Sequence, residues 1–199
     1  WSVQHTVAVH SVTLQLASAV EYLHSKRIIH RDLKPQNMLM NTDDTRVVLC
    51  DLGMAVRQPE TMSVMDNLDR TEYVTSRYYR APELWSGQSQ SAHRTLARYS
   101  ATIDMWSLGC ILMELCMGSV LLPGRSPAEQ ASLSRQDAVN NTITRRLEEA
   151  LPAKRAGTVG KLVQVVSQYL LRTSPSCRAS AIKFRIVLVK HCGAACGAE

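Results

Sequence analysis

The chain has 199 residues, of which 45% are hydrophobic and 5% aromatic, and its formal net charge is +6. This length suffices for one well-packed domain, and the sequence shows neither an internal repeat nor a signal-peptide pattern. A positive charge is compatible with nucleic-acid binding, but the arginines are scattered and stacking residues are few, so we expect phosphate groups and acidic protein partners rather than nucleic acid.

The first predicted element is a helix. Apolar residues recur over residues 7–24 with a mixed spacing that fits a helix with a broad buried face. Two isoleucines, Ile28 and Ile29, then lead directly into a polar segment.

Three short polar motifs follow in order, reading HRDLKPQN at residues 30–37, DLG at 51–53 and APE at 81–83. Phosphoryl transfer needs a group that orients the acceptor hydroxyl, a cation near the transferred phosphoryl group and ligands for Mg²⁺. Asp32 suits the first role as a general base, and Lys34 suits the second. Each motif alone also fits a capped turn, but together they predict transfer from ATP to a protein hydroxyl.

The magnesium ligands are expected at Asn37 and Asp51, which offer the hard oxygen atoms that Mg²⁺ prefers. Residues 38–50 read as an apolar strand, a polar turn and a second, β-branched strand. Such a hairpin would bring the two ligands beside each other, so that one nucleotide-bound metal site forms from distant residues.

These motifs resemble the C-terminal lobe of a eukaryotic protein kinase, and more closely the mitogen-activated protein kinases of the CMGC group. Lys34 and the proline after it are similar to the serine/threonine branch. Residues 71–83, TEYVTSRYYRAPE, resemble the dual-phosphorylation lip and substrate-binding loop of that family. The resemblance implies a mainly α fold, namely the large lobe with a small β-hairpin at the catalytic loop and no small lobe, and it adds Leu39 to the ATP-binding residues.

The resemblance also implies an activation switch at Thr71 and Tyr73. A Thr-x-Tyr triplet alone would read as an ordinary loop, but these two residues lie between the DLG and APE motifs, where a phosphorylated loop can be ordered by arginines. We expect phosphothreonine 71 to pair with Arg31, and phosphotyrosine 73 to pair with Arg77 and Arg80. The expected partner is an upstream dual-specificity kinase.

Substrate preference is expected from the same loop. Arg80 and the tyrosines before it resemble the feature that favours proline directly after the phosphorylated Ser or Thr, so we expect Ser/Thr-Pro protein substrates. Ser76 stands where the family has a threonine whose hydroxyl bonds the catalytic Asp and Lys. Leu52 replaces the family's Phe and can fill the same apolar slot. Cys50 reads as a buried hydrophobe more readily than as a reactive thiol.

Residues 99–115 are apolar nearly all round and predict a helix at the centre of the domain, capped by Ser100 or Thr102. A membrane span is not expected, because Asp104 would lie in the hydrocarbon. By resemblance, Asp104 receives hydrogen bonds from the catalytic-loop backbone, and Glu83 forms an ion pair with Arg178 that holds the substrate loop.

Further helices are predicted over residues 126–136, 142–151 and 159–171. The resemblance fades after residue 181, so we assign residues 1–185 to a kinase C-terminal lobe and 186–199 to a divergent tail. The six cysteines show no paired spacing, which favours reduced thiols in a cytoplasmic or nuclear setting.

No Gly-rich phosphate loop, strand lysine or partner glutamate precedes the catalytic loop in this sequence. We therefore expect this fragment alone to be inactive. The leading hypothesis is a proline-directed Ser/Thr kinase that uses ATP and Mg²⁺. The alternative is a catalytically dead, truncated kinase that acts as a regulatory or docking protein.

Overall fold

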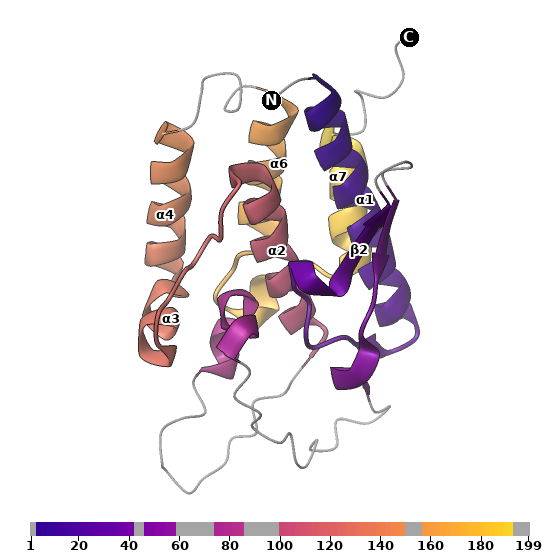
Figure 1. Cartoon of the computed structure of the whole chain (residues 1–199), viewed down its shortest axis with the longest axis horizontal. Coiled ribbons are helices and arrows are strands. Elements are labelled where there is room, and N and C mark those ends of the chain that lie inside the picture. Colours follow the sequence, from indigo (N-terminus) through magenta and orange to yellow (C-terminus); the bar gives the residue numbers. More distant parts are fainter. Residues whose placement is uncertain (1–2, 42–45, 59–73, 86–99, 150–156, 193–199) are drawn as a thin grey trace, which may run out of the picture.

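Helices that run roughly side by side form most of the computed structural model, with a β-hairpin on one side of them (Figure 1). The structure describes residues 3–41, 46–58, 74–85, 100–149 and 157–192. The mainly helical composition and the hairpin agree with the sequence prediction.

The helix α2, Thr102–Met117, lies in the middle of the bundle and supplies much of the core (Figure 1). Trp106, Leu108 and Leu112 are fully buried, so the expectation of a central helix is confirmed. The helix ends at Gly118, whose φ of 79° lies in the left-handed region that suits glycine, and whose N–H bonds a carbonyl of the last turn. No helix within the described residues is long and apolar enough to cross a membrane.

The start of α2 differs from the prediction. Ala101 occupies the N-cap position and makes no side-chain cap bond, so neither Ser100 nor Thr102 is the N-cap residue. Their two hydroxyls instead bond each other at 2.6 Å, and the Ser100 Oγ accepts from the Thr102 N–H at 3.4 Å. The Ser100 hydroxyl therefore satisfies the backbone N–H of Thr102, the first residue of the helix.

Three further helices pack around α2. The helix α1, Val3–Ser25, begins four residues before the predicted 7–24 segment and lies against α7, Ala181–Cys192; both contact α6, Thr158–Tyr169. Phe184 and Leu188 of α7 are fully buried, which explains why α7 continues across residue 186 without interruption.

The described residues also form α3, Pro127–Leu133, and α4, Gln136–Glu149, at the edge of the bundle (Figure 1). Ser126 caps α3, because its Oγ accepts from the Glu129 N–H at 3.1 Å. The helix α4 begins six residues before the predicted 142–151 segment, since Val139 already lies in the core.

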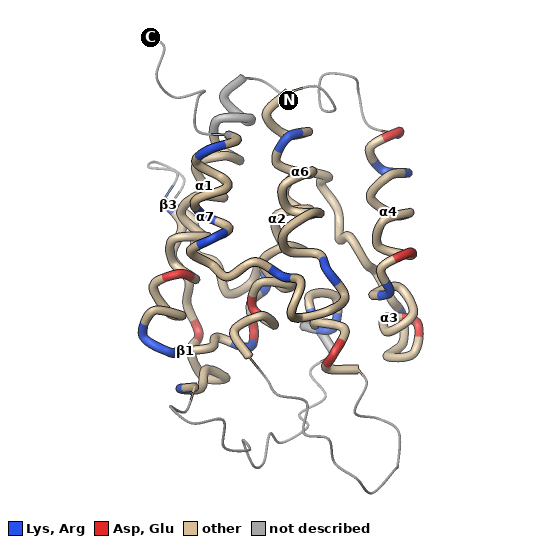
Figure 2. Tube along the Cα trace, turned by 180° about the vertical axis from the view of Figure 1, so that it is seen from behind, with Lys and Arg blue, Asp and Glu red and all other residues tan. Residues whose placement is uncertain are grey.

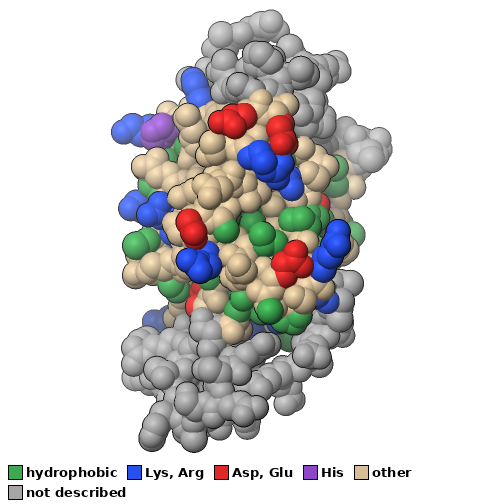
Figure 3. Space-filling model, turned by 90° about the vertical axis from the view of Figure 1, so that its left-hand side faces the viewer, with side chains coloured by type: hydrophobic (Ala, Val, Ile, Leu, Met, Phe, Trp, Pro, Cys, Tyr) green, Lys and Arg blue, Asp and Glu red, His purple; other side chains and the backbone are tan. Residues whose placement is uncertain are grey.

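Charged residues of both signs recur along the described trace (Figure 2). On the side that α3 and α4 occupy, Lys and Arg lie beside Asp and Glu with apolar side chains between them (Figure 3). The ion pair of Arg145 and Glu149 in α4 is one such exposed pair, at 2.8 Å.

Two small antiparallel sheets flank the polar segment at residues 30–37. The strands β2, Met38–Asn41, and β3, Arg46–Leu49, pair with Met38 opposite Leu49, which confirms the predicted hairpin. The Gln15 side chain of α1 accepts from the Val47 N–H at 2.9 Å and ties the hairpin to the bundle. The strands β1, Ile28–Ile29, and β4, Val56–Arg57, pair with each other and bracket the first two polar motifs along the chain.

Candidate active site

The polar loop after β1 has an unusual backbone. Arg31 has a φ of 71°, a left-handed conformation that non-glycine residues adopt at an energetic cost. Its neighbour His30 is fully buried, and the His30 ring contacts the Cys50 carbonyl at 3.2 Å and the Asp32 N–H at 3.3 Å. The surrounding structure must therefore hold this loop in place.

Asp104 of α2 provides that support. Its carboxylate is 1% exposed and accepts from the backbone N–H of His30 at 2.8 Å and from that of Arg31 at 2.9 Å. The His24 ring at the end of α1 lies 2.9 Å from the same carboxylate. One buried carboxylate thus joins two helices to the loop and accepts from the backbone N–H of the left-handed residue Arg31 and from that of the residue before it.

Three predicted site residues meet directly. The Lys34 Nζ lies 2.6 Å from the Asp32 Oδ2, and both side chains are mostly buried. The Asn37 Nδ2 donates to the same Oδ2 at 3.2 Å and to the Asp32 carbonyl at 2.8 Å. Because η1, Pro35–Asn37, turns the chain back on itself, residues separated by a few positions form one cluster.

Asp51 joins this cluster through the hairpin. The Cys50 N–H donates to the Asn37 carbonyl at 2.9 Å, which brings the residue before Asp51 against Asn37. Asp51 has a φ of 62°, and its Oδ1 accepts from the Gly53 N–H at 3.2 Å. A Cβ on Gly53 would lie 3.1 Å from that oxygen, so glycine gives the carboxylate room for this orientation.

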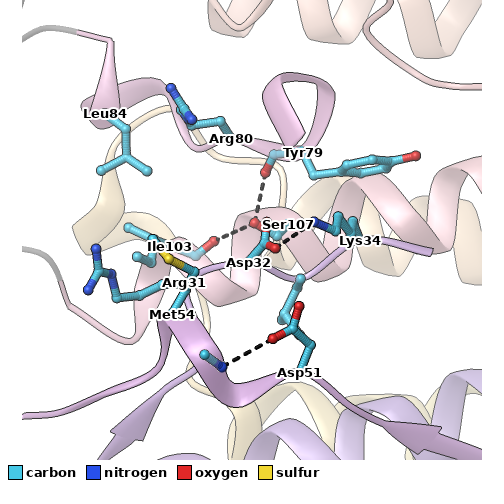
Figure 4. A pocket seen from close by; sticks show the side chains of 12 residues that line it. Arg31, Asp32, Lys34, Asp51, Met54, Tyr79, Arg80, Leu84, Ile103 and Ser107 are labelled. Atoms are coloured by element: carbon cyan, nitrogen blue, oxygen red, sulfur yellow. Dashed lines mark hydrogen bonds and ion pairs between the residues drawn. The ribbon is translucent and has the colours of Figure 1, made fainter. Parts of the chain in front are cut away.

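A cavity of about 350 Å³ lies next to these groups (Figure 4). In that view Lys34 and Asp51 lie on one side, whereas the side chains of Arg31 and Arg80 extend toward the side of Leu84. The cavity is therefore polar at its centre and cationic at one flank, with residues from four separate segments: Arg31, Asp32, Leu33, Lys34, Asp51, Gly53, Met54, Tyr79, Arg80, Leu84, Ile103 and Ser107.

The structure describes only some residues of the predicted activation switch. Thr71 and Tyr73 lie outside the described residues, and Ser76 is placed as part of η3, Val74–Tyr79. Arg77 donates to the Arg125 carbonyl at 2.9 Å, away from the cavity lining. Arg31 and Arg80 both line the cavity.

Glu83 and Arg178 form a bidentate ion pair across 95 positions of sequence, with distances of 2.6 and 2.7 Å. Arg178 also donates to three backbone carbonyls, those of Thr102, Arg172 and Thr173. Its side chain is fully buried, and the pair fastens η4, Pro82–Leu84, to the start of α2.

Two contacts at the site were not predicted from the sequence. The Tyr79 hydroxyl donates to the Glu114 carboxylate of α2 at 2.6 Å, and the Ser107 Oγ donates to the Tyr79 carbonyl at 2.7 Å. Burial, reinforced by the Glu114 carboxylate, raises the pKa of Tyr79 well above its ordinary value. The only advance signal was Glu114 itself, an acid within an apolar helix.

Leu39 lies on the outer face of the hairpin and is 60% exposed. Met40, Val48 and Leu52 are also more than half exposed. Leu39 and Val48 stand opposite each other and share one face of the hairpin, whereas Met40 points to the other face. The face with Leu39 adjoins Asn37 along the chain and exposes apolar side chains of the kind that mark a binding face.

A mainly helical lobe with this polar cluster beside a β-hairpin is compatible with the large lobe of a protein kinase. Comparison with known families supports this class, because the family described as protein kinase domain matches residues 3–186. The chain therefore belongs to the protein kinase family.

Similar proteins with names indicate which group of protein kinases this chain resembles. The chain is 44% identical over 119 residues to mitogen-activated protein kinase homolog NTF6 of Nicotiana tabacum, covering 60% of this chain and 28% of that protein. It is 37% identical over 162 residues to mitogen-activated protein kinase 5 of Oryza sativa subsp. indica, covering 81% and 38%. It is 42% identical over 122 residues to cyclin-dependent kinase-like 5 of Mus musculus, covering 61% and 12%.

These names belong to the CMGC group of protein kinases, and the same comparisons assign the sequence of this chain to that group of the protein kinase family. The chain spans less than two fifths of the length of each of these three relatives.

Proposed function

We propose that the protein containing this chain is a Ser/Thr protein kinase that transfers the γ-phosphoryl group of ATP to protein hydroxyls. The observation that carries the proposal is the contact set of Asp32, Lys34 and Asn37 beside a cavity that Asp51 also lines. These residue types match the needs of phosphoryl transfer, which relies on positioning and charge stabilisation more than on covalent chemistry.

In this proposal Asp32 orients the acceptor hydroxyl and receives its proton. Lys34, at 2.6 Å from the Asp32 carboxylate, supplies positive charge where negative charge develops. The Asn37 amide group holds the Asp32 carboxylate by a hydrogen bond, and the Asp104 carboxylate holds the backbone of the same loop. A fixed loop keeps the reacting groups in place without reorganisation during the reaction.

Protein kinases use ATP and Mg²⁺, and the side chains present suit that pair. The amide nitrogen of Asn37 donates to Asp32, which leaves its Oδ1 as a ligand atom, and Asp51 adds a carboxylate. When bound, Mg²⁺ neutralises phosphate charge and orients the terminal phosphoryl group. The exposed apolar face with Leu39 suits the flat nucleobase.

Activation by phosphorylation at Thr71 and Tyr73 is part of the proposal. Arg31 and Arg80 line the cavity and are cationic groups of the kind that pair with phosphate. Ser/Thr-Pro substrates are proposed from the resemblance of the Arg80 segment. We predict that Thr71→Ala or Tyr73→Phe abolishes stimulated activity in the full-length protein, and retained stimulation in both variants would contradict the switch.

The proposal is tested by phosphate transfer from radiolabelled Mg²⁺-ATP to a Ser-Pro peptide. Asp32→Asn in the full-length protein should lower kcat by roughly 10²–10⁴-fold, because general-base assistance is lost while the shape is kept. Asp137→Asn serves as the matched control, since Asp137 is an exposed aspartate in a loose pair with Arg135 at 3.5 Å.

The control variant should retain wild-type activity. Equal activity of Asp32→Asn and wild type would refute the assigned role. A wild-type protein that binds partners but transfers no phosphate would favour the regulatory or docking alternative.

A further inference from the structure

The sequence contains two Ser-Pro pairs, Ser126-Pro127 and Ser174-Pro175, and no Thr-Pro pair. For a kinase that favours proline directly after the phosphorylated residue, both serines are candidate acceptors. Both are exposed. Their side chains differ in the bonds that they already make, so the structure distinguishes the two.

Ser126 is engaged by its own helix. Its Oγ accepts from the Glu129 N–H at 3.1 Å, and the Glu129 carboxylate accepts from the Arg125 N–H at 2.8 Å. The two side chains therefore cap α3 together. Phosphate transfer to Ser126 requires this capped turn to open, and the new phosphate group would lie near the Glu129 carboxylate, which is a like charge.

Ser174 has no such role in its turn. It precedes the short turn η6, Pro175–Cys177, and its side chain makes no cap bond. Among the described residues its Oγ contacts only the Ser176 Oγ, at 2.9 Å, and both serines are exposed. Its φ of −73° and ψ of 122° are extended, as is usual before proline. Water readily replaces a bond between two exposed hydroxyls, so the Ser174 Oγ is available to react.

The charges near Ser174 also suit a phosphate group. The sequence has no Asp or Glu between residues 150 and 198, whereas arginines stand at positions 172 and 178. The Glu83 carboxylate approaches from another segment, but it is already paired with Arg178 at 2.6 Å. A phosphate group on Ser174 therefore meets less like charge from its own segment than one on Ser126.

The turn that follows Ser174 can open locally. Two backbone hydrogen bonds close η6, from the Cys177 N–H to the Ser174 carbonyl and from the Arg178 N–H to the Pro175 carbonyl, both at 3.1 Å. An exposed turn held by so few bonds opens more easily than the core of a domain. The Ser174-Pro175 pair can therefore enter the active site of another molecule without the loss of a helix.

The residues on both sides of the pair are fixed in their own molecule. The Thr173 N–H donates to the Gln136 side chain at 2.9 Å, and the Thr173 carbonyl accepts from the buried Arg178 at 3.0 Å. Ser174 is not among the described residues that line the cavity next to Asp32. A segment anchored in this way does not reach the Asp32 of its own molecule, so the enzyme must be another molecule.

We propose that Ser174 is a phosphorylation site and that the enzyme is a second copy of this protein. The Ser174 Oγ attacks the γ-phosphorus of ATP bound to the second copy. A new O–P bond forms as the bond from the γ-phosphorus to the β,γ-bridging oxygen breaks. ADP leaves, and Asp32 of the second copy takes the hydroxyl proton. The identity of the enzyme rests on the proposed kinase function, whereas the acceptor role of Ser174 rests on its exposure and its bonds.

The first experiment mixes two full-length proteins with Mg²⁺-ATP. The acceptor is an affinity-tagged Asp32→Asn variant, whose own transfer is slow, and the enzyme is the untagged wild type. Mass spectrometry measures the phosphate on each Ser-Pro pair of the acceptor. We expect about ten-fold more phosphate on Ser174 than on Ser126, and about ten-fold less on Ser174 when the acceptor also carries Pro175→Ala.

Peptides with the sequences of residues 120–132 and 168–180 separate the effect of the fold from local preference. Such short peptides keep no stable helix and no tertiary contacts. The wild type should therefore phosphorylate both serines in the peptides, while it spares Ser126 in the folded acceptor. A Ser126 peptide that takes no phosphate would overturn the structural distinction between the two serines.

The second experiment tests the acceptor role without the activity of this protein. A purified proline-directed Ser/Thr kinase of known activity replaces the wild type as the enzyme. Phosphate on Ser174 and not on Ser126 supports the acceptor role. If this kinase phosphorylates Ser174 and the wild type phosphorylates only the peptides, a second copy is not the enzyme, and that part of the proposal is refuted.

Absence of phosphate on Ser174 with both enzymes would overturn the proposal, and so would equal phosphate on Ser174 and Ser126. A wild type that phosphorylates neither the peptides nor the acceptor would refute the proposed kinase function. Phosphate placed on Ser174 by the purified kinase would still support the acceptor role in that case.

Discussion

Replacement of Arg178 by alanine should destabilise the protein more than any other single arginine substitution in the described residues. The side chain is fully buried and makes five hydrogen bonds, two to the Glu83 carboxylate and three to backbone carbonyls. Its removal leaves a largely buried carboxylate without its counter-charge. Breaking a buried ion pair in this way costs about 3–5 kcal/mol, a large part of the roughly 5–15 kcal/mol that stabilises a typical domain.

The free energy of unfolding would be measured by urea denaturation of the full-length wild type and variants. Arg145→Ala is the matched control, because Arg145 forms an exposed pair with Glu149 and its loss should cost less than about 0.5 kcal/mol. The double variant Glu83→Gln/Arg178→Ala should recover part of the loss, since it removes the unpaired charge. Equal stability of Arg178→Ala and Arg145→Ala would refute the reasoning.

Three further substitutions test the packing and the titrating groups. Gly124→Ala should cost about 1–3 kcal/mol in denaturant unfolding, because its Cβ would lie 2.7 Å from the backbone of Gln130. Burial and the Glu114 hydrogen bond raise the pKa of Tyr79, so the folded protein keeps a proton that the unfolded chain loses near pH 10. The free energy of unfolding should therefore fall above pH 10 by about 1.4 kcal/mol per pH unit, and Tyr79→Phe should remove this slope. Burial lowers the pKa of His10, whose Nε2 has no partner among the described residues. The free energy of unfolding should therefore fall as the pH drops below about 6.5. In His10→Leu this fall, measured by denaturant unfolding at about pH 7 and pH 5, should be smaller.

The sequence predicted the elements around the site well where a local pattern was strong. The apolar strand, polar turn and β-branched strand read over residues 38–50 identified the hairpin, and the apolar run over 99–115 identified α2. Boundaries were weaker: α4 starts six residues early, and Ala101 replaces Ser100 or Thr102 as the N-cap residue of α2. The first and last residues of a helix depend on which of its faces is buried, and packing against neighbouring elements decides that.

In the candidate site, too, the contacts that a local pattern encodes were predicted from the sequence. Asp32, Lys34 and Asn37 lie within one short segment, so their contacts follow from a tight turn that the sequence itself encodes. The placement of Asp51 follows from strand pairing, which the strand–turn–strand pattern of residues 38–50 also predicted.

What the sequence determined by itself was the chemistry: the types of polar group, their order and the family to which they belong. Family resemblance also predicted two long-range contacts, from Asp104 to the loop backbone and between Glu83 and Arg178. Other contacts between distant groups were decided by the tertiary structure alone. The Tyr79 hydroxyl donates to the Glu114 carboxylate, and the Arg80 guanidinium lies over the Trp85 ring. Such contacts form only when packing of the helices excludes water from both partners, and no periodicity along a single segment carries that information.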